Sequence, residues 1–216
     1  MRNSKLFKFI MMSVMLCSAS AAFASSASAL STNGPGNFTA TAPASLLTIA
    51  TASPVGVQCS GTSAAGALRG LTAVAAPVQL TNSLTLSFTG CTAAGLPSTV
   101  TCSTTASQLW ATANPTGGVT PGQVRGVSCQ IKPTSFPACT INVNPTGGTG
   151  ATVASGSYNN TGSVLTVNAA GQALTASWTS CPFITPNTGS AAATFTNTAG
   201  GNLVYTVTSA FKPVIS

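Results

Sequence analysis

Cysteine is the most chemically reactive residue type in this chain, because the acidic residues and histidines that most enzymes use are missing. The 216 residues include seven cysteines and no aspartate, glutamate or histidine. General acid–base catalysis draws mainly on those three absent types, whose pKa values proteins tune to the working pH. Calcium and magnesium prefer carboxylate oxygens, and zinc prefers histidine or thiolate. The composition predicts a protein that is not an enzyme and holds no metal or cofactor.

The N-terminus has the features of a bacterial secretory signal peptide. Residues 9–16 are an apolar stretch that is too short to span a membrane, and small residues follow it. We expect residues 1–24 to be removed, and cleavage after Ala29 is the alternative. The product would pass through the periplasm to the cell surface or the medium and would have no transmembrane span. The basic residues that precede the apolar stretch are Arg2, Lys5 and Lys8.

Cleavage leaves few charges, and these are scattered along the chain. Without a run of basic residues there is no electrostatic footprint for nucleic acid, so no nucleic-acid partner is expected. Weak attraction to an acidic matrix polysaccharide stays open. A serine or threonine nucleophile with a lysine base is also conceivable, but no pattern marks such a pair. The four remaining cations are Arg69, Arg125, Lys132 and Lys212.

Six cysteines remain after cleavage, and an even number in an exported chain indicates disulfide bonds. Cys17 would be lost with the signal peptide. Lipid attachment there is the alternative, although bulky Leu16 precedes it where a lipoprotein signal requires a small residue. No Cys-x-x-Cys pair is present to hold zinc, and no histidine is present to activate a thiol. The predicted disulfide cysteines are Cys59, Cys91, Cys102, Cys129, Cys139 and Cys181.

Short alternations of apolar and polar residues between Gly, Pro and Asn turns dominate the chain after the signal peptide. Leu84, Leu86 and Phe88 alternate with threonine and serine, which is typical of antiparallel strands with one buried face. No stretch there has a sustained helical period. We predict an all-β fold, an antiparallel β-sandwich with an internally duplicated β-unit. A flexible segment over 25–43 would precede a single sandwich domain over 44–216.

The duplication is suggested by two similar segments, 84–91 and 174–181, which lie 90 residues apart. Each has the order Leu-Thr-x-Ser-aromatic-Thr-small-Cys, and each follows an earlier cysteine on a predicted strand. A chance match in a chain rich in serine and threonine is the alternative. If each unit bridges its own strand pair, one disulfide is left between the units. The predicted pairs are Cys59–Cys91, Cys139–Cys181 and Cys102–Cys129.

Four aromatic side chains admit two interpretations. Flat aromatic faces suit sugar rings, but the same residues could fill the core or the rim of the sheet. Trp178 is in phase with the predicted core positions of its strand, which favours the core. The four residues are Trp110, Tyr158, Trp178 and Tyr205.

Several segments resemble a family of small secreted bacterial proteins, the alkane-oxidation activators of the PraA/PraB type. They are the opening 34–45, the Val-Gln-Cys of 57–59, the Gly-Ser-Tyr-Asn-Asn-Thr of 156–161 and the Gln-Ala-Leu of 172–174. The resemblance implies export, an all-β fold and a surface or extracellular role linked to growth on hydrocarbons and to biofilm. It implies no catalytic residues.

The composition favours a protein that acts at apolar interfaces. The chain is 44% hydrophobic and nearly uncharged, so little repulsion separates copies of it. We expect self-association, adhesion to hydrocarbon or other apolar surfaces, and a place in the biofilm matrix. The alternative is a pilin-like or self-assembling filament subunit, in which residues 25–45 would be the donated strand.

Overall fold

The computed structural model describes residues 29–103 and 107–216, which form fifteen strands and their connections, without a helix. All the pairings of these strands are antiparallel, as the sequence predicts. The predicted signal peptide, residues 1–24, lies outside the described residues. No helix in the described part of the chain is long and apolar enough to cross a membrane.

Eight strands close into an antiparallel barrel, because β2 pairs with β14 on one side and with β3 on the other. This closed ring differs from the predicted sandwich, in which two separate sheets would face each other. The order around the ring is β2, β14, β13, β10, β9, β6, β5 and β3. Its strands are β2 (Ser45–Ile49), β3 (Val55–Leu68), β5 (Thr81–Ala93), β6 (Leu96–Cys102), β9 (Cys129–Pro133), β10 (Thr140–Pro145), β13 (Leu174–Thr179) and β14 (Gly189–Asn197).

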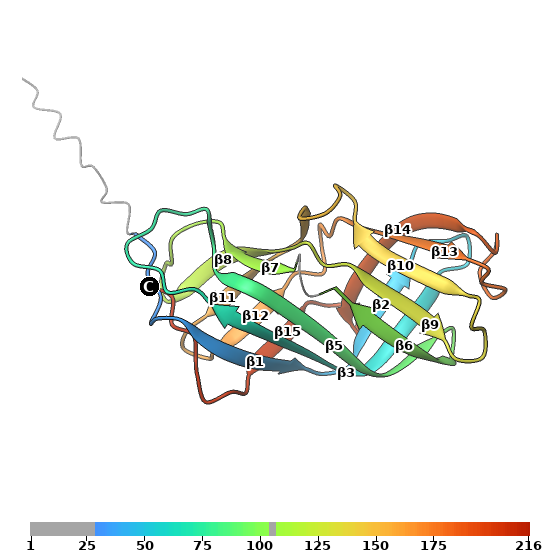
Figure 1. The fold of residues 1–216 in the computed structure, drawn as a ribbon, viewed down its shortest axis with the longest axis horizontal. Coiled ribbons are helices and arrows are strands. Elements are labelled where there is room, and N and C mark those ends of the chain that lie inside the picture. The colour runs from blue at the N-terminus through green and yellow to red at the C-terminus, as the bar shows by residue number, and fades with distance from the viewer. Residues whose placement is uncertain (1–28, 104–106) are drawn as a thin grey trace, which may run out of the picture.

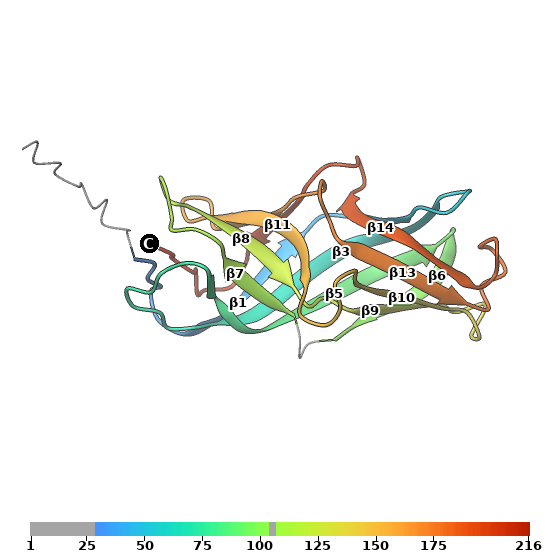
Figure 2. The same ribbon diagram turned by 90° about the horizontal axis from the view of Figure 1, so that it is seen from above.

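The remaining strands form a second lobe that continues from β3 at one end of the barrel (Figures 1 and 2). The sheet of this lobe curls round, and its last strand, β4, leads through Leu80 directly into β5. The amide of Leu80 donates to Leu109 O at 2.8 Å, and the Leu80 carbonyl accepts from the amide of Arg69 at 2.8 Å. The strands, in hydrogen-bonded order, are β1 (Gly36–Ala42), β15 (Leu203–Val207), β12 (Val164–Val167), β11 (Thr152–Asn159), β8 (Val119–Arg125), β7 (Gln108–Ala111) and β4 (Val78–Gln79).

The long strands β3 and β5 are shared by the barrel and the second lobe, and we call the region where they pass between the two the waist. Both strands change the face that they bury there. The buried residues of β3 change phase between Cys59 and Thr62. Gly90 lies at the change in β5, with φ of 56°, and a Cβ at this position would clash with the Ser60 hydroxyl. Glycine adopts this left-handed conformation without the steric cost that other residues incur.

Each lobe has its own hydrophobic core. Ile131, Ile141 and Trp178 belong to the barrel core, and Leu84 and Tyr205 belong to the core of the second lobe. These side chains come from alternating positions, as antiparallel strands with one buried face require. Val127, Val167 and Phe195 pack against both cores. The two cores therefore meet at the waist.

From Leu30 onward the N-terminal segment packs into the fold, whereas the sequence predicts a flexible segment over 25–43, of which residues 25–28 lie outside the described residues. Leu30 is fully buried, and β1 pairs with β3 on one side and with β15 on the other. The alternation of Phe38, Ala40 and Ala42 with threonine explains the difference, because these three side chains complete the second core. Low charge and many small residues in the sequence concealed a strand pattern.

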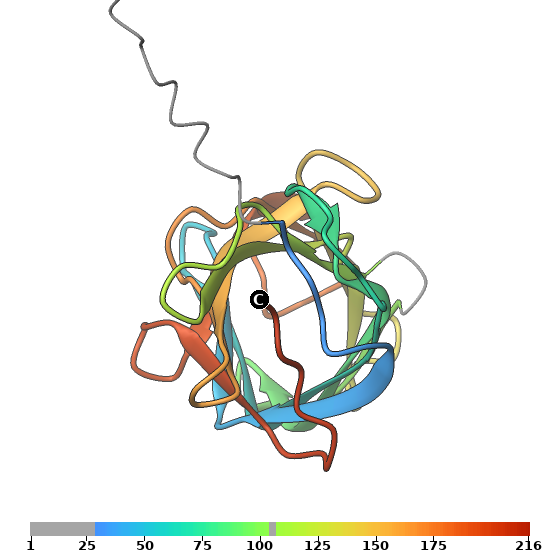
Figure 3. The ribbon, with the colours of Figure 1, turned by 90° about the vertical axis from the view of Figure 1, so that its left-hand side faces the viewer.

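The C-terminal tail crosses the open mouth of the second lobe (Figure 3). Asn160 clamps the tail, since its Oδ1 accepts from the amide of Ile215 at 3.0 Å and its Nδ2 donates to Ile215 O at 2.6 Å. The Tyr158 hydroxyl donates to Pro213 O at 2.7 Å. Ser31 and Ser216 exchange two backbone hydrogen bonds. The N-terminal segment and the tail thus close this end together.

Within the barrel, the strands fall into two four-stranded units with the same connectivity. The first unit is β2–β3–β5–β6 and the second is β9–β10–β13–β14, and each strand pairs with the next in its unit. The last strand of each unit pairs with the first strand of the other. The similar segments 84–91 and 174–181 fall on the third strand of each unit. The two segments occupy different positions along their strands, because Cys91 is inside β5 whereas Cys181 follows the end of β13.

Candidate functional site

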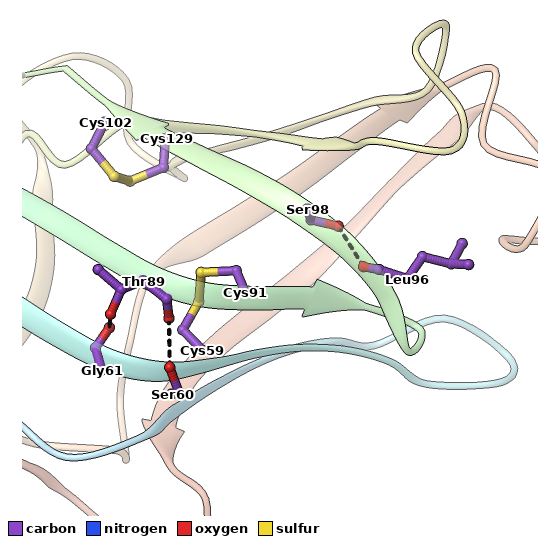
Figure 4. The surroundings of a disulfide bond; sticks show 9 residues. All are labelled: Cys59, Ser60, Gly61, Thr89, Cys91, Leu96, Ser98, Cys102 and Cys129. Atoms are coloured by element: carbon purple, nitrogen blue, oxygen red, sulfur yellow. Dashed lines mark hydrogen bonds between the residues drawn. A yellow bond between two sulfur atoms is a disulfide. The ribbon is translucent and has the colours of Figure 1, made fainter.

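The six cysteines form three disulfide bonds, in the pairs expected from the sequence. Two of them join residues that are directly opposite on adjacent strands (Figure 4). Cys59 and Cys91 link β3 to β5 with a Cα–Cα distance of 4.0 Å, and Cys102 and Cys129 link β6 to β9 at 3.9 Å. Beside the first bridge, the Ser60 hydroxyl donates to Thr89 O at 3.1 Å. Both disulfides cross-link adjacent strands of the barrel wall.

The third disulfide, Cys139–Cys181, lies in the connections at one end of the barrel. Both cysteines are fully buried, and their Cα atoms are 4.5 Å apart. Cys139 immediately precedes β10, and Cys181 follows β13. The bridge therefore holds the β9–β10 connection against the β13–β14 connection.

Four connections gather at this end of the barrel, farthest from the C-terminal tail, on the right in Figure 1. We call them the loop end, defined as residues 50–54, 94–95, 134–138 and 182–188. The loop end contains no charged residue and is made of Ala, Pro, Phe, Ser, Thr, Gly, Asn and Ile. Such a surface has no charged group to desolvate on contact with an apolar phase.

An aromatic pair lies at the loop end. The side chain of Phe136 is 38% exposed, and its ring centroid is 6.1 Å from that of Phe183. The turn that carries Phe136 is fixed by two hydrogen bonds, from its amide to Pro133 O at 3.2 Å and from the amide of Cys139 to its carbonyl at 2.9 Å. Pro137 beside it is exposed. Phe136 is thus presented to solvent by a rigid turn next to a disulfide.

The structure does not bring the four candidate sugar-stacking residues together. Trp178 and Tyr205 are 3% exposed and Tyr158 is 8% exposed, so all three are core residues. Trp110 is half-buried on β7, with the guanidinium of Arg125 4.2 Å from its ring centroid. That cation covers a ring face which a sugar would need.

The four cations are dispersed over the fold. Arg69 follows β3, Arg125 ends β8, Lys132 lies exposed on β9, and Lys212 lies in the C-terminal tail, where its Nζ donates to Val207 O. Nothing in residues 29–103 and 107–216 groups three His, Cys, Asp or Glu side chains as a metal site requires.

An apolar cavity of about 90 Å³ lies at the waist. Its wall combines residues of both cores, such as Ile131 and Leu174 from the barrel and Leu84 and Leu203 from the second lobe. We call it the waist cavity. Sequence patterns predicted some wall residues, such as Leu84 and Leu86, on a buried strand face, but a void between two cores depends on how the lobes meet.

Comparison of the chain with protein-family models, with curated proteins and with solved structures finds no match. The functional interpretation therefore rests on the loop end and the waist cavity. Sequence reasoning missed Phe136 and Phe183. The sequence does contain a signal, because each of these phenylalanines adjoins a proline close to a disulfide cysteine. Phe136-Pro137 lies just before Cys139, and Pro182-Phe183 lies just after Cys181.

Proposed function

We propose that the protein is exported and attaches to apolar surfaces, without catalysing a reaction, through its loop end. The observation that carries this proposal is the exposed Phe136 on a disulfide-anchored turn, in a loop end without charged residues and four residues from exposed Lys132. Burying an aromatic ring is favourable, and aromatic residues commonly anchor contacts with apolar phases. Because the turn is already fixed, little conformational entropy is lost on contact.

The resemblance to alkane-oxidation activators supports hydrocarbon as the apolar phase and a place in the biofilm matrix. The signal peptide and three disulfides support export, since disulfides persist mainly in oxidising compartments. Self-association through the same loop end follows from its lack of charge, because two copies would not repel each other there.

We further propose that the two four-stranded units of the barrel are copies of one duplicated β-unit. The shared connectivity and the similar segments on the third strands support this. Connections of both units reach the loop end. Those of the first unit, 50–54 and 94–95, lack aromatic residues, whereas those of the second carry Phe136 and Phe183. The second copy would then be the one adapted to contact.

The alternative, a filament subunit that donates its N-terminal strand, is less well supported. Strand donation needs an unpaired N-terminal strand and an open groove to receive a partner's strand. Here β1 is hydrogen-bonded to β3 and to β15 within its own chain.

The test is adsorption to hexadecane droplets by the Phe136→Ser variant. Removing the exposed part of the ring should cost about 1 kcal/mol of adsorption free energy, which is a roughly fivefold lower adsorption constant. Val204→Ser is the matched control, because Val204 is 42% exposed and lies on β15, in the second lobe. If both variants adsorb as the unchanged protein does, the loop end is not the contact surface.

A further inference from the structure

The waist cavity has a wall of carbon and sulfur atoms, contributed by both lobes. Leu84 and Leu165 line it from the second lobe, and Val57 and Leu174 line it from the barrel. The disulfide cysteine Cys59 also contributes to the wall. The closed barrel and the curled lobe each have their own core, and the cavity lies where the two cores meet.

Gln172 and Tyr205 are the polar side chains that line the cavity, and almost none of the wall surface is polar. Gln172 accepts from the amide of Phe195 at 2.7 Å through Oε1, and its Nε2 donates to Asn168 O at 2.9 Å and to Phe195 O at 2.5 Å. A buried water needs two to four polar partners, and the Gln172 amide, with both of its N–H groups in use, offers at most one further acceptor lone pair. A cavity with such a wall stays dry.

We propose that the waist cavity is a binding site for a small, uncharged hydrocarbon. The space is smaller than the engineered cavity of about 150 Å³ in another protein that binds benzene or xenon, so a short alkane or a single compact ring is the size class. A molecule with a charged or strongly polar group would lose its hydration without gaining a partner. The site lies at the waist and does not involve the loop end, so this inference goes beyond the proposed function.

Xenon is the first probe, because it is apolar, small and free of any hydrogen-bonding group. The chain without its signal peptide should produce a saturable change in the xenon NMR shift. Ala154 is 2% exposed and lines the cavity, so Ala154→Leu should fill the space and abolish the saturable part. Ala192→Leu is the matched control, since Ala192 is exposed on β14, and it should leave the response unchanged.

Benzene and a cavity-enlarging variant provide a second measurement that does not depend on the folding of Ala154→Leu. Leu86 lines the cavity, so Leu86→Ala should bind benzene at least about tenfold more tightly than the unchanged protein, although it melts at a lower temperature. A xenon response that rises without saturation, or one that Ala154→Leu leaves intact, would overturn the proposal. So would equal benzene affinity in Leu86→Ala and in the unchanged protein.

Discussion

In the absence of Asp and Glu, Arg125 and Lys212 contact neutral groups. The guanidinium of Arg125 lies over the Trp110 ring, and its Nη2 donates to Gln123 Oε1 at 2.9 Å. Lys212 donates to a backbone carbonyl. Cation–π contacts and amide acceptors replace the ion pairs that other proteins use, and they contain no group that titrates in acid.

The buried tyrosines make stability depend on pH only in alkali. Burial raises the pKa of Tyr205 above its ordinary value, so the folded state holds this proton more tightly than the unfolded state does. The stabilisation is complete below about pH 10 and is lost as the pH rises through the folded pKa. We expect a thermal midpoint that stays within a few degrees between about pH 3 and pH 9 and then falls.

The Tyr205→Phe variant isolates this effect, because phenylalanine keeps the ring and lacks the proton. Its thermal midpoint should fall less steeply above about pH 10 than that of the unchanged protein, at constant salt. An equally steep fall in both proteins would assign the alkaline loss to other groups. A change of more than a few degrees between about pH 4 and pH 8 would contradict the expected flat range.

The Cys139–Cys181 disulfide joins two connections at the loop end, whereas the other two disulfides join adjacent strands of the barrel. Replacing both cysteines by serine opens a loop with a sequence separation of 42 residues and should cost about 2–4 kcal/mol of unfolding free energy. It should also weaken adsorption to hexadecane, because the Phe136 turn loses its anchor.

The Cys102–Cys129 bridge is the matched control for that experiment. It closes a similar loop, with a separation of 27 residues, but it lies between β6 and β9. Its double serine variant should lose comparable stability, measured by urea denaturation, and keep its adsorption to hexadecane. Equal loss of adsorption in the two double variants would show that stability, and not the geometry of the loop end, controls attachment.

The C-terminal tail gives a prediction about the opposite end of the molecule. Asn160→Ala removes both hydrogen bonds to Ile215 and should cost about 1–3 kcal/mol. Backbone amide exchange should become faster at Ile215 and Ser216 than in the unchanged protein. Asn168→Ala is the control, because the half-buried Asn168 side chain donates to Ser155 Oγ, and the substitution keeps the backbone carbonyl that accepts from Gln172. Equal exchange rates in the two variants would mean that Asn160 does not hold the tail.

The strands of the barrel were predictable where apolar and polar residues alternate, as in Leu174–Thr179, and so were the disulfide pairs. The strand β1 was missed because its inward residues include two alanines, which give a weak hydrophobic signal. Closure of the ring was also beyond sequence reasoning. It depends on the pairing of β2 with β14, which are about 150 residues apart in the chain and share no sequence pattern.

The whole molecule is built from two lobes on one pair of long strands. This arrangement separates the loop end from the mouth that the C-terminal tail covers (Figure 1). The waist cavity, lined by residues of both lobes, lies between them. Contact with a surface at the loop end would leave the opposite end free. A protein of this shape could coat an apolar surface while its second lobe faces the water.

The effect of salt on attachment tests whether the protein binds surfaces by apolar contact or by its charges. Attachment by apolar contact should be unchanged or slightly stronger when salt rises from about 10 mM to about 150 mM, because salt does not weaken apolar burial. An ionic adhesin held by its cations to an acidic polysaccharide should instead detach as those charges are screened. Adsorption to hexadecane and to an anionic polysaccharide, each measured across this range, separates the two. Strong, salt-sensitive polysaccharide binding without affinity for the oil would overturn the proposed function, since only dispersed charges such as Lys132 could then mediate attachment.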